Sequence, residues 1–449
     1  MAAARIDEID LLVVGTGPVG CAIARTVRTL APGVRILLVD AGTAGTGQHR
    51  DNVEPPGPPE PPVFDTGQHA TGAEPRPATS PVFGPDSDLP GYAQATQSGG
   101  LGTTWTCATP TPDGTEREPA IPAPEWAAAL AEARRLLRVR PDSWPRVDAL
   151  LDALRAGYPD LPPDRGVTMM PTAMTRTGDR PHWTGPADIL GDVESFEIWS
   201  STACRRLILR AGRVVAAHLN DTEIRVGAVA VAADAVRTPQ LLWDSGIRPA
   251  ALGRYAADHL QLLAAVAWPG SRVPARWGRD RTAAMLWVPY GDRHPYHGQV
   301  MLFDQRAEDD AMVVGLSWLV PPVIDAGNHL TFDPPHVTYP LSDEDHRRVR
   351  GATDDIRRAM RALGDRVLPG GEPRLLPRGS SLHLTGTVRM GGRPDGTSVC
   401  DPHGRVWGVP NLFVAGNGVL SASTAGNPTL TSVALALRSA AATVRSLKP

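Results

Sequence analysis

Two short apolar runs, separated by a glycine-containing turn and a helix-like segment, open the chain. Residues 9–14 (IDLLVV) and 34–39 (VRILLV) have the length of buried strands, and residues 21–31 (CAIARTVRTLA) between them have helical spacing. This order of strand, glycine turn, helix and strand predicts one βαβ unit over residues 9–40. The chain is therefore expected to begin with a dinucleotide-binding fold.

Further along the chain, the apolar pattern alternates between helical and strand periodicity. Residues 203–233 form short alternating runs, with Gly212 placed for a hairpin turn, and predict a small antiparallel sheet. The helix near the C-terminus is apolar enough to be buried. The predicted helices lie within residues 123–157, 342–364 and 427–444, and further strands are expected within 260–340 and 411–419.

Residues 51–90 interrupt this pattern. The segment is rich in proline and has almost no apolar periodicity, which predicts a long excursion without regular structure. A loop of this length in a compact domain is usually a lid, an interface arm or disordered. We expect an arm or a lid, and the sequence does not choose between them.

Composition and charge exclude several classes of function. The formal net charge is −3 and no basic run occurs, so no nucleic-acid partner is expected. No apolar run reaches the roughly 18 residues of a membrane span, and acidic residues precede the first strand where a signal peptide would be apolar, so we expect a cytoplasmic protein without a membrane partner. Lys448 is the only lysine, which leaves Schiff-base and P-loop chemistry without a plausible residue.

The cysteines of the chain lie far apart and form no CxxC pair. This spacing argues against a zinc site and against a disulfide framework, so no metal is expected. Plain thiols, mostly buried, are expected at Cys21, Cys107, Cys204 and Cys400.

The turn between the first strand and the first helix contains the pattern GxGxxG. Gly15 allows the tight turn, Gly17 lets the backbone approach a pyrophosphate, and Gly20 permits close packing of the helix. Asp40 ends the second strand, where an acid accepts hydrogen bonds from ribose hydroxyls. The motif itself fits FAD or NAD, and the sequence DAG that starts at Asp40 favours FAD.

Two segments in the last part of the chain contain residues that suit the chemistry of a bound flavin. Asn427 is a good N-cap and Pro428 suits the first helical position, so the positive end of this helix could stabilise the anionic edge of a reduced flavin. His383, in SLHLTGTVRMGG, has a side chain suited to take the proton of an alcohol as hydride leaves for the flavin. By contrast, we expect His294 and His297 to be surface or packing residues.

Several longer segments resemble one family, the GMC oxidoreductases, and within it the pyranose 2-oxidases and glycoside 3-oxidases. The similar segments are HLTGTVRMG, VCDPHGRVWGVPNLFVAGNGVLSASTAGNPTLTSVALAL, SGGLGTTWTCATP, ADAVRTPQLLWDSGI and HPYHGQVMLF, which occur in family order across most of the chain. The resemblance implies an α/β fold of two domains, a PHBH-like Rossmann FAD-binding domain and a substrate domain built on a mixed sheet of six strands. The expected FAD-binding domain comprises residues 1–50, 91–122, 195–260 and 380–449, the expected substrate domain comprises residues 123–194 and 261–379, and residues 51–90 are the arm or lid.

The resemblance also assigns roles to single positions. His383 takes the place of the catalytic histidine and Asn427 that of its paired asparagine, while Thr106 corresponds to a threonine near flavin N5 and Gln299 to a glutamine that contacts the sugar. The substrate-binding set is therefore Gln299, Thr106, His383 and Asn427. The expected cofactor-binding set is Gly15, Gly17, Gly20, Asp40, Ala41, Gly100, Thr103, Thr104, Thr106, Cys107, Ala203, Cys204, Ala233, Asn417, Pro428 and Thr429.

This sequence departs from the family pattern at two places. Thr104 stands where the family has the histidine that links the flavin covalently, so we expect noncovalent FAD and reoxidation by oxygen or by a quinone-like acceptor. The loop VMLFDQ differs from the charged and aromatic sugar loop of the fungal enzymes. The expected reaction is oxidation of a ring alcohol of a pyranose or glycoside to a keto-sugar. The alternatives are a natural-product alcohol such as an aminoglycoside, aminocyclitol or C-glycoside, and an inactive flavoprotein-like scaffold; the oligomeric state stays open.

Overall fold

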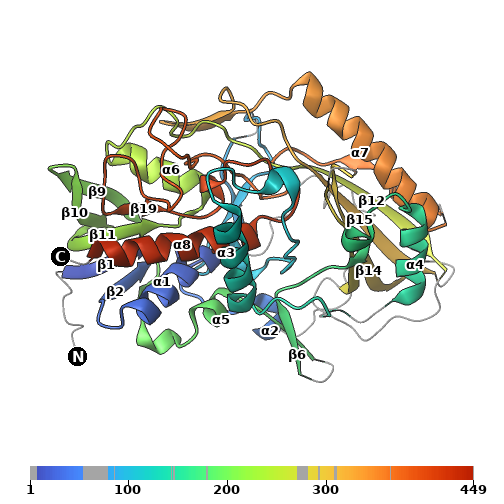
Figure 1. Cartoon of the computed structure of the whole chain (residues 1–449), viewed down its shortest axis with the longest axis horizontal. Helices are drawn as coiled ribbons and strands as arrows, with labels where there is room; N and C mark the ends of the chain where they lie inside the picture. Colours follow the sequence, from blue (N-terminus) through green and yellow to red (C-terminus); the bar gives the residue numbers. More distant parts are fainter. Residues whose placement is uncertain are drawn as a thin grey trace.

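The fold is that of a computed structural model of the whole chain (Figure 1). The structure describes residues 8–53, 79–84, 86–142, 144, 147–177, 180–269, 282–291, 294–307, 311–364 and 366–447. Two large sheets lie at opposite ends of the molecule, and the chain passes between them several times.

The first sheet has seven strands in the order β8-β2-β1-β11-β10-β9, with β19 paired to β11. β1 pairs in parallel with both β2 and β11, as the predicted βαβ unit requires, and apolar residues make these three strands mostly buried. Its strands are β1 (Glu8–Val14), β2 (Ile36–Val39), β8 (Glu197–Trp199), β9 (Cys204–Arg210), β10 (Arg213–Leu219), β11 (Thr222–Val231) and β19 (Leu412–Val414).

The strands predicted within residues 203–233 form, but not as a separate small sheet. β9, β10 and β11 are antiparallel to one another, and Gly212 occupies the predicted turn with φ 73°. β11 then continues along β1 and β19 in parallel. Its last four residues, 228–231, are buried on both faces, and this wholly apolar end can only be covered inside the larger sheet.

The helices α1, α3, α5 and α8 pack together beside the first sheet (Figure 1), and α6 (Asp234–Asp244) packs against β9 of the same sheet. The apolar helix α8 (Thr429–Leu447) contacts α1 (Pro18–Leu30), which bears the glycine turn, and α3 (Ala123–Leu136) packs against α8 from outside. α5 (Pro186–Leu190) packs against α1. The expected cap is not formed as predicted: α8 begins at Thr429, and the Asn427 Oδ1 accepts a hydrogen bond from the side chain of Gln299 instead.

The second sheet has six strands in the order β18-β12-β15-β14-β13-β5. Every pairing among these strands is antiparallel, so the expected mixed sheet is wrong in this detail. β13, β14 and β15 follow one another through short connections, which suffice only for antiparallel neighbours. The strands are β5 (Thr168–Met169), β12 (Leu260–Trp268), β13 (Thr282–Val288), β14 (His297–Arg306), β15 (Met312–Val320) and β18 (Arg374–Leu375).

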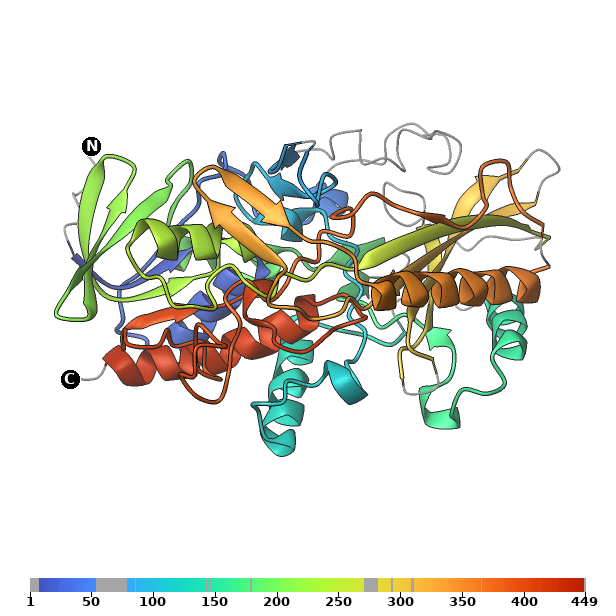
Figure 2. The ribbon, with the colours of Figure 1, turned by 90° about the horizontal axis from the view of Figure 1, so that it is seen from above.

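The predicted polar helix is present as α7 (Asp343–Ala362), which lies along the second sheet (Figure 2). Ser342 and Asp345 form a capping box at its start. α7 packs its buried face against β12 and β15, and α4 (Asp148–Gly157) packs against α7. The helices expected within 123–157 and 342–364 are therefore confirmed.

The remaining elements of the described residues are shorter, apart from α6. The helical ones are α2 (Arg50–Val53), α6 (Asp234–Asp244), η2 (Gly100–Thr103), η3 (Gly114–Glu116), η4 (Pro163–Arg165), η5 (Val193–Ser195) and η6 (Asn417–Val419). The strands are β3 (Thr79–Pro81), β4 (Ala93–Ala95), β6 (Met174–Thr177), β7 (Arg180–Trp183), β16 (His329–Phe332) and β17 (Pro335–Thr338).

The predicted Pro-rich excursion is described only at its ends. Residues 54–78 and 85 lie outside the described residues. Near the end of the segment, β3 pairs with β4, so the expectation of no regular structure is wrong there. The arm or lid itself stays a prediction.

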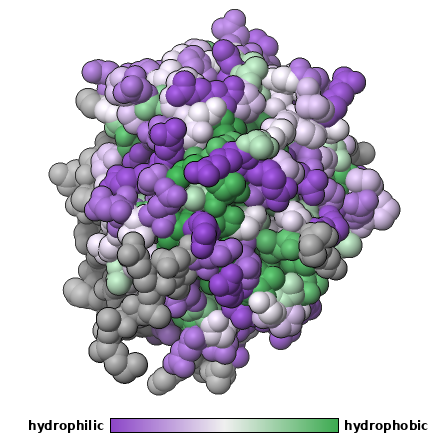
Figure 3. All heavy atoms as spheres, turned by 90° about the vertical axis from the view of Figure 1, so that its left-hand side faces the viewer, coloured by the Kyte–Doolittle hydropathy of each residue, from purple (hydrophilic) through white to green (hydrophobic). Residues whose placement is uncertain are grey.

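The face at the amino ends of the parallel strands is shown in Figure 3. Hydrophilic residues surround hydrophobic patches on this face. Glu8, Arg35 and Arg225 are among the charged residues that line a hollow at the amino ends of β1 and β2. Ligands of open α/β sheets bind at the opposite, carboxyl edge, to which the glycine turn belongs. No helix within the described ranges combines the length and the apolar character needed to cross a membrane.

Two glycines of the turn, Gly15 and Gly20, leave no room for a side chain. Gly15 has φ 104°, and a Cβ built on it would lie 2.3 Å from the carbonyl oxygen of Ala232. A Cβ on Gly20 would lie 2.0 Å from the carbonyl oxygen of Gly15. These two glycines bring α1 directly against the ends of β1 and β11.

We predict that Gly20→Ala strains this packing, because the added methyl group meets backbone atoms that cannot rotate away. Overpacking of this kind costs about 1–3 kcal/mol. The matched control is Gly33→Ala, since a Cβ at Gly33 has no atom within 4 Å. Thermal unfolding should give a clearly lower melting temperature for Gly20→Ala than for Gly33→Ala; equal melting temperatures would contradict the prediction.

Candidate active site

The carboxyl edge of the first sheet brings the predicted nucleotide residues together. Asp40 follows β2, and its Oδ2 accepts hydrogen bonds from the backbone N–H (2.9 Å) and the hydroxyl (2.6 Å) of Thr16, inside the glycine turn. The Thr16 hydroxyl in turn accepts from the backbone N–H of Gly99 at 2.8 Å. Thr16 therefore links the glycine turn by hydrogen bonds to Asp40 and to the segment before Gly100. The sequence analysis did not single out this residue.

The backbone around this turn forms an open cradle. A Cβ on Gly17 would have only the Gly99 carbonyl oxygen within 4 Å, at 3.7 Å, and a Cβ on Gly100 only the Cα of Gly17, at 3.9 Å. Gly15 also approaches the backbone of Ala233, whose nitrogen lies 3.4 Å from the built Cβ. The first N–H groups of α1 face this cradle and suit a pyrophosphate.

The residues expected around the nucleotide lie beside Asp40. The backbone N–H of Thr202 donates to the Asp40 carbonyl at 2.8 Å, and Ala203 donates to the side chain of Asn220 at 3.0 Å. Cys204 begins β9 directly after this strip, and Ala41 is exposed next to Asp40. The donor set and the cradle together fit a dinucleotide such as FAD.

The second predicted flavin element sits at the same edge, because β19 runs parallel to β11. Asn417 follows β19, and its Oδ1 accepts a hydrogen bond of 2.6 Å from Ser432 in the first turns of α8. The carbonyl of Pro428 accepts from the Ser432 N–H at 2.8 Å, which makes Pro428 and Thr429 the start of this helix. The positive end of α8 is thereby fixed next to Asn427.

The segment after η2 presents Thr106 between two anchored neighbours. The indole N–H of Trp105 donates to the Thr184 carbonyl at 2.8 Å, and the carbonyl of buried Cys107 accepts from the N–H of Ala173. The Thr106 side chain itself is exposed. Thr103 is buried and its hydroxyl donates to Gly100, while Thr104 is half-buried at the end of η2.

His383 and Asn427, far apart in sequence, meet in the structure. Their facing atoms, Nε2 of His383 and Nδ2 of Asn427, are 3.5 Å apart. Gln299, on β14 of the second sheet, donates to the Asn427 Oδ1 at 2.6 Å, which turns the amide nitrogen of Asn427 toward His383. Three of the four predicted substrate residues therefore converge, and among the described residues Thr106 makes no hydrogen bond to them.

Asp258 and His259 complete the surroundings of His383 and were not predicted. The Asp258 Oδ1 accepts from the backbone N–H of His383 at 3.0 Å and from the Ser381 hydroxyl at 2.7 Å, and burial raises the pKa of this carboxyl to about 6. The two imidazoles of His259 and His383 contact each other edge to face. The signal that could have found the pair is a polar Asp-His dipeptide directly before the apolar strand β12.

Two buried carboxylates hold the loop that leads to Asn427. Glu118 accepts hydrogen bonds from the backbone and the hydroxyl of Ser421, and Glu116 accepts from the backbone N–H groups of Ala425 and Gly426. Burial raises the pKa of both carboxyl groups, while the N–H donors favour their charged forms. Because the backbone of this loop is satisfied by side chains, it can be buried without secondary structure.

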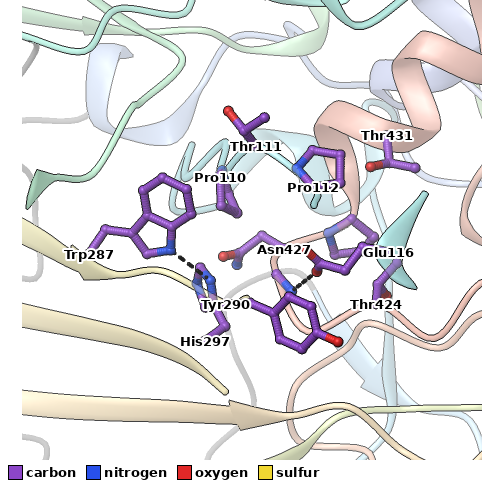
Figure 4. A pocket seen from close by; sticks show the side chains of 12 residues that line it. Pro110, Thr111, Pro112, Glu116, Trp287, Tyr290, His297, Thr424, Asn427 and Thr431 are labelled. Carbon is purple, nitrogen blue, oxygen red and sulfur yellow. Dashed lines mark hydrogen bonds between the residues drawn. The ribbon is translucent and has the colours of Figure 1, made fainter. Parts of the chain in front are cut away.

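A small pocket opens on one side of Asn427, at the start of α8 (Figure 4). His297 lines this pocket and accepts a hydrogen bond of 3.0 Å from the indole N–H of Trp287. His297 is fully buried, which agrees with the expectation of a packing residue, and it also forms part of the wall of the pocket. His294 is a packing residue, buried and bonded to Asp355 at 2.6 Å.

The other expectations about side-chain chemistry concern cysteine and metal. All four cysteines are free thiols, three of them buried and Cys204 half-buried. In the part of the chain that the structure describes, no three His, Cys, Asp or Glu side chains are grouped so that they could hold a metal ion.

Burial makes the stability contribution of His297 depend on pH. Burial lowers the pKa of His297 to about 3, whereas an unfolded histidine has a pKa of about 6.5. Between these two pKa values the unfolded chain binds a proton at this histidine and the folded chain does not. The contribution of neutral His297 to the free energy of unfolding is therefore fully present above about pH 6.5 and is lost as the pH falls toward about 3. Urea unfolding at about pH 7 and about pH 5 should show a smaller acid-induced loss for His297→Phe than for the wild type; an equal loss would contradict this.

Comparison with known proteins agrees with this geometry. Residues 328–436 match the family model described as GMC oxidoreductase. The chain is 35% identical to a C-glycoside 3-oxidase from Arthrobacter globiformis, over 96% of this chain and 94% of the relative. It is 28% identical to a pyranose 2-oxidase from Tricholoma matsutake, over 98% and 95%.

Among solved structures, a pyridoxine 4-oxidase from Mesorbium loti shares the fold with a TM-score of 0.65 at 18% identity, over 97% of this chain and 99% of that one. The expected α/β fold class is thereby confirmed. Taken with the cradle at the glycine turn and the paired His383 and Asn427, these similarities show that the chain belongs to the GMC oxidoreductase family and is an FAD-dependent oxidoreductase acting on CH–OH groups.

Proposed function

We propose that the protein oxidises a secondary ring hydroxyl of a glycoside or pyranose to a keto-sugar, with His383 as the base. The observation that carries the proposal is the 3.5 Å separation between Nε2 of His383 and Nδ2 of Asn427. One hydroxyl oxygen can lie within hydrogen-bond distance of both nitrogens at this spacing.

The two side chains divide the work on that hydroxyl. Bound FAD would supply the acceptor for the hydride that leaves the alcohol carbon. Nε2 of His383 takes the hydroxyl proton, while the amide N–H of Asn427 donates to the same oxygen and keeps it aligned. Loss of one hydride and one proton leaves a carbonyl, so atoms and electrons balance.

The amide of Gln299 beside the pair supports a sugar as substrate. Gln299 reaches the pair from the second sheet, and Thr106 presents an exposed hydroxyl from the segment after η2. The relatives named C-glycoside 3-oxidase and pyranose 2-oxidase favour carbon 3 or carbon 2 as the oxidised position. We favour a glycoside, because the C-glycoside oxidase is the more similar of these two relatives.

We further propose that the two sheets correspond to two domains. The strands of the first sheet come from the predicted FAD-binding segments 1–50, 195–260 and 380–449. Apart from Leu260 at the start of β12, the second sheet comes from the predicted substrate segments 123–194 and 261–379. α3 belongs to the predicted substrate segments but packs on α8, so the boundary around it would move toward the FAD-binding domain.

The FAD is proposed to be held without a covalent bond. The support is Thr104, which has no nucleophilic imidazole to offer at the position where the family attaches the flavin. Reoxidation by oxygen or by a quinone-like acceptor, and a place in the cytoplasm, belong to the same proposal.

We predict that His383→Ala abolishes reduction of the flavin by substrate, because the hydroxyl proton has no acceptor. Loss of a general base typically costs about 10²–10⁴-fold in rate. Anaerobic bleaching of the flavin should be followed with a panel of free sugars, O- and C-glycosides and aminoglycosides. His218→Ala, on the partly exposed face of β10, is the matched control and should bleach at the wild-type rate.

Two results of this experiment would count against the proposal. A His383→Ala protein that bleaches like the wild type would remove His383 as the base. Bleaching by aminoglycosides alone would move the substrate away from simple sugars and glycosides, while leaving the flavin chemistry in place.

We predict that acid precipitation releases all the FAD into the supernatant, because Thr104 cannot hold it through an imidazole nitrogen. The measurement is the flavin absorbance of the supernatant and of the redissolved pellet. A yellow pellet would contradict noncovalent binding.

A further inference from the structure

The feature that the proposed function leaves unused is His259, whose ring touches His383. Its side chain is almost fully buried, and both of its ring nitrogens have partners. Nδ1 lies 2.9 Å from Nδ1 of His383, and Nε2 lies 2.6 Å from the carbonyl oxygen of Thr424. Any role of His259 in the reaction rests on the proposed function, in which His383 is the base.

The position of the proton on His259 follows from its partners. The Thr424 carbonyl can only accept a hydrogen bond, so Nε2 of His259 must carry the proton. Burial lowers the pKa of His259 to about 4, so the ring is neutral near neutral pH and has a single N–H. Its Nδ1 is therefore a bare acceptor.

The proton on His383 follows in turn. A contact of 2.9 Å between two ring nitrogens needs one proton, and His259 has none to give on that side. His383 must therefore carry its proton on Nδ1. In a neutral His383 this leaves a lone pair on Nε2, the nitrogen that faces the donating amide of Asn427.

We propose that His259 is a positioning residue that holds His383 in the Nδ1–H tautomer through the Thr424 carbonyl, so that Nε2 is the unprotonated base. When the substrate hydroxyl gives its proton to Nε2, the Nδ1–H of His383 keeps its acceptor on His259. The imidazolium is then stabilised in place, without reorientation of the ring.

The backbone fixes the three partners relative to one another. Ala257 and Thr385 exchange two backbone hydrogen bonds, so the strand-like segments that carry His259 and His383 run side by side. Thr424 belongs to the loop whose backbone N–H groups donate hydrogen bonds to the carboxylates of Glu116 and Glu118. Any buried histidine needs a partner for its N–H, but here the second ring nitrogen faces the proposed base itself.

The charged and titratable groups near His259 agree with a neutral ring. Asp258 directs its carboxylate at the backbone of His383 and at Ser381, not at the ring of His259. His297, which is also neutral by burial, is the other nearby imidazole. An ion pair with a carboxylate would favour the charged form of the His259 ring. No carboxylate among the described residues forms one with it.

The direct test reads the tautomer in the wild-type holoenzyme. Nitrogen NMR of protein labelled with ¹⁵N-histidine, with His383→Ala used to assign the signal, should show His383 protonated on Nδ1 and bare on Nε2. A coupling across the hydrogen bond between the two Nδ1 atoms would identify His259 as the acceptor. A His383 protonated on Nε2 would overturn the proposal.

The kinetic test uses His259→Phe, which keeps a ring but removes the acceptor. We expect the rate of flavin reduction at saturating substrate to fall roughly 10- to 100-fold, part of what a general base contributes. FAD content and KM should stay near those of the wild type. His259→Asn, whose amide oxygen can take the place of Nδ1, should recover part of the rate.

The outcomes separate this proposal from the proposed function. If His383→Ala stops flavin reduction while His259→Phe reduces its flavin at the wild-type rate, only the positioning role falls. If His383→Ala is itself active, the base assignment falls first. If His259→Phe does not fold, the wild-type NMR result decides.

Discussion

The parallel pairing of β1 with β2 and β11 is the constraint on which the rest of this molecule depends. Parallel strands end at the same edge, so the glycine turn after β1, Asp40 after β2 and Ala233 after β11 meet there. β19 joins the same edge and places Asn417 and the start of α8 beside them. The contact between Gly15 and Ala232 shows how closely these ends approach, and only glycine permits it.

Buried polar groups, and not regular structure, hold His383 and Asn427, the proposed catalytic pair. Glu116, Glu118 and Asp258 accept hydrogen bonds from backbone N–H groups on both sides of the site. Burying a carboxylate is expensive unless its oxygens are bonded, and the cost of disturbing such a group is correspondingly high. These groups give two irregular loops the fixed geometry that hydride and proton transfer require.

The site also lies where the two sheets come together. His383 and Asn427 belong to the half that would hold the flavin, whereas Gln299 and His297 come from β14 of the second sheet. A substrate bound there touches residues from both halves, so variation in the second sheet can change the substrate while the reaction is kept.

Local pattern in the sequence was enough to predict the opening βαβ unit, the glycine turn, α7, α8 and the longer strands of both sheets, because periodicity and turn chemistry act over a few residues. The short strands β5, β8 and β18 were not predicted. His383 and Asn427 were predicted from their local sequence and again from family motifs, whereas Gln299 was predicted from family motifs alone. The small antiparallel sheet proved to be part of the larger first sheet, and the second sheet is antiparallel where a mixed sheet was expected. Thr16, Glu116, Asp258 and His259 were missed. Their roles depend on contacts between segments tens to hundreds of residues apart, such as the one that joins His259 to Thr424. Only the tertiary structure brings such partners within hydrogen-bond distance. For this reason the sequence could not show that a second histidine, His259, lies against His383.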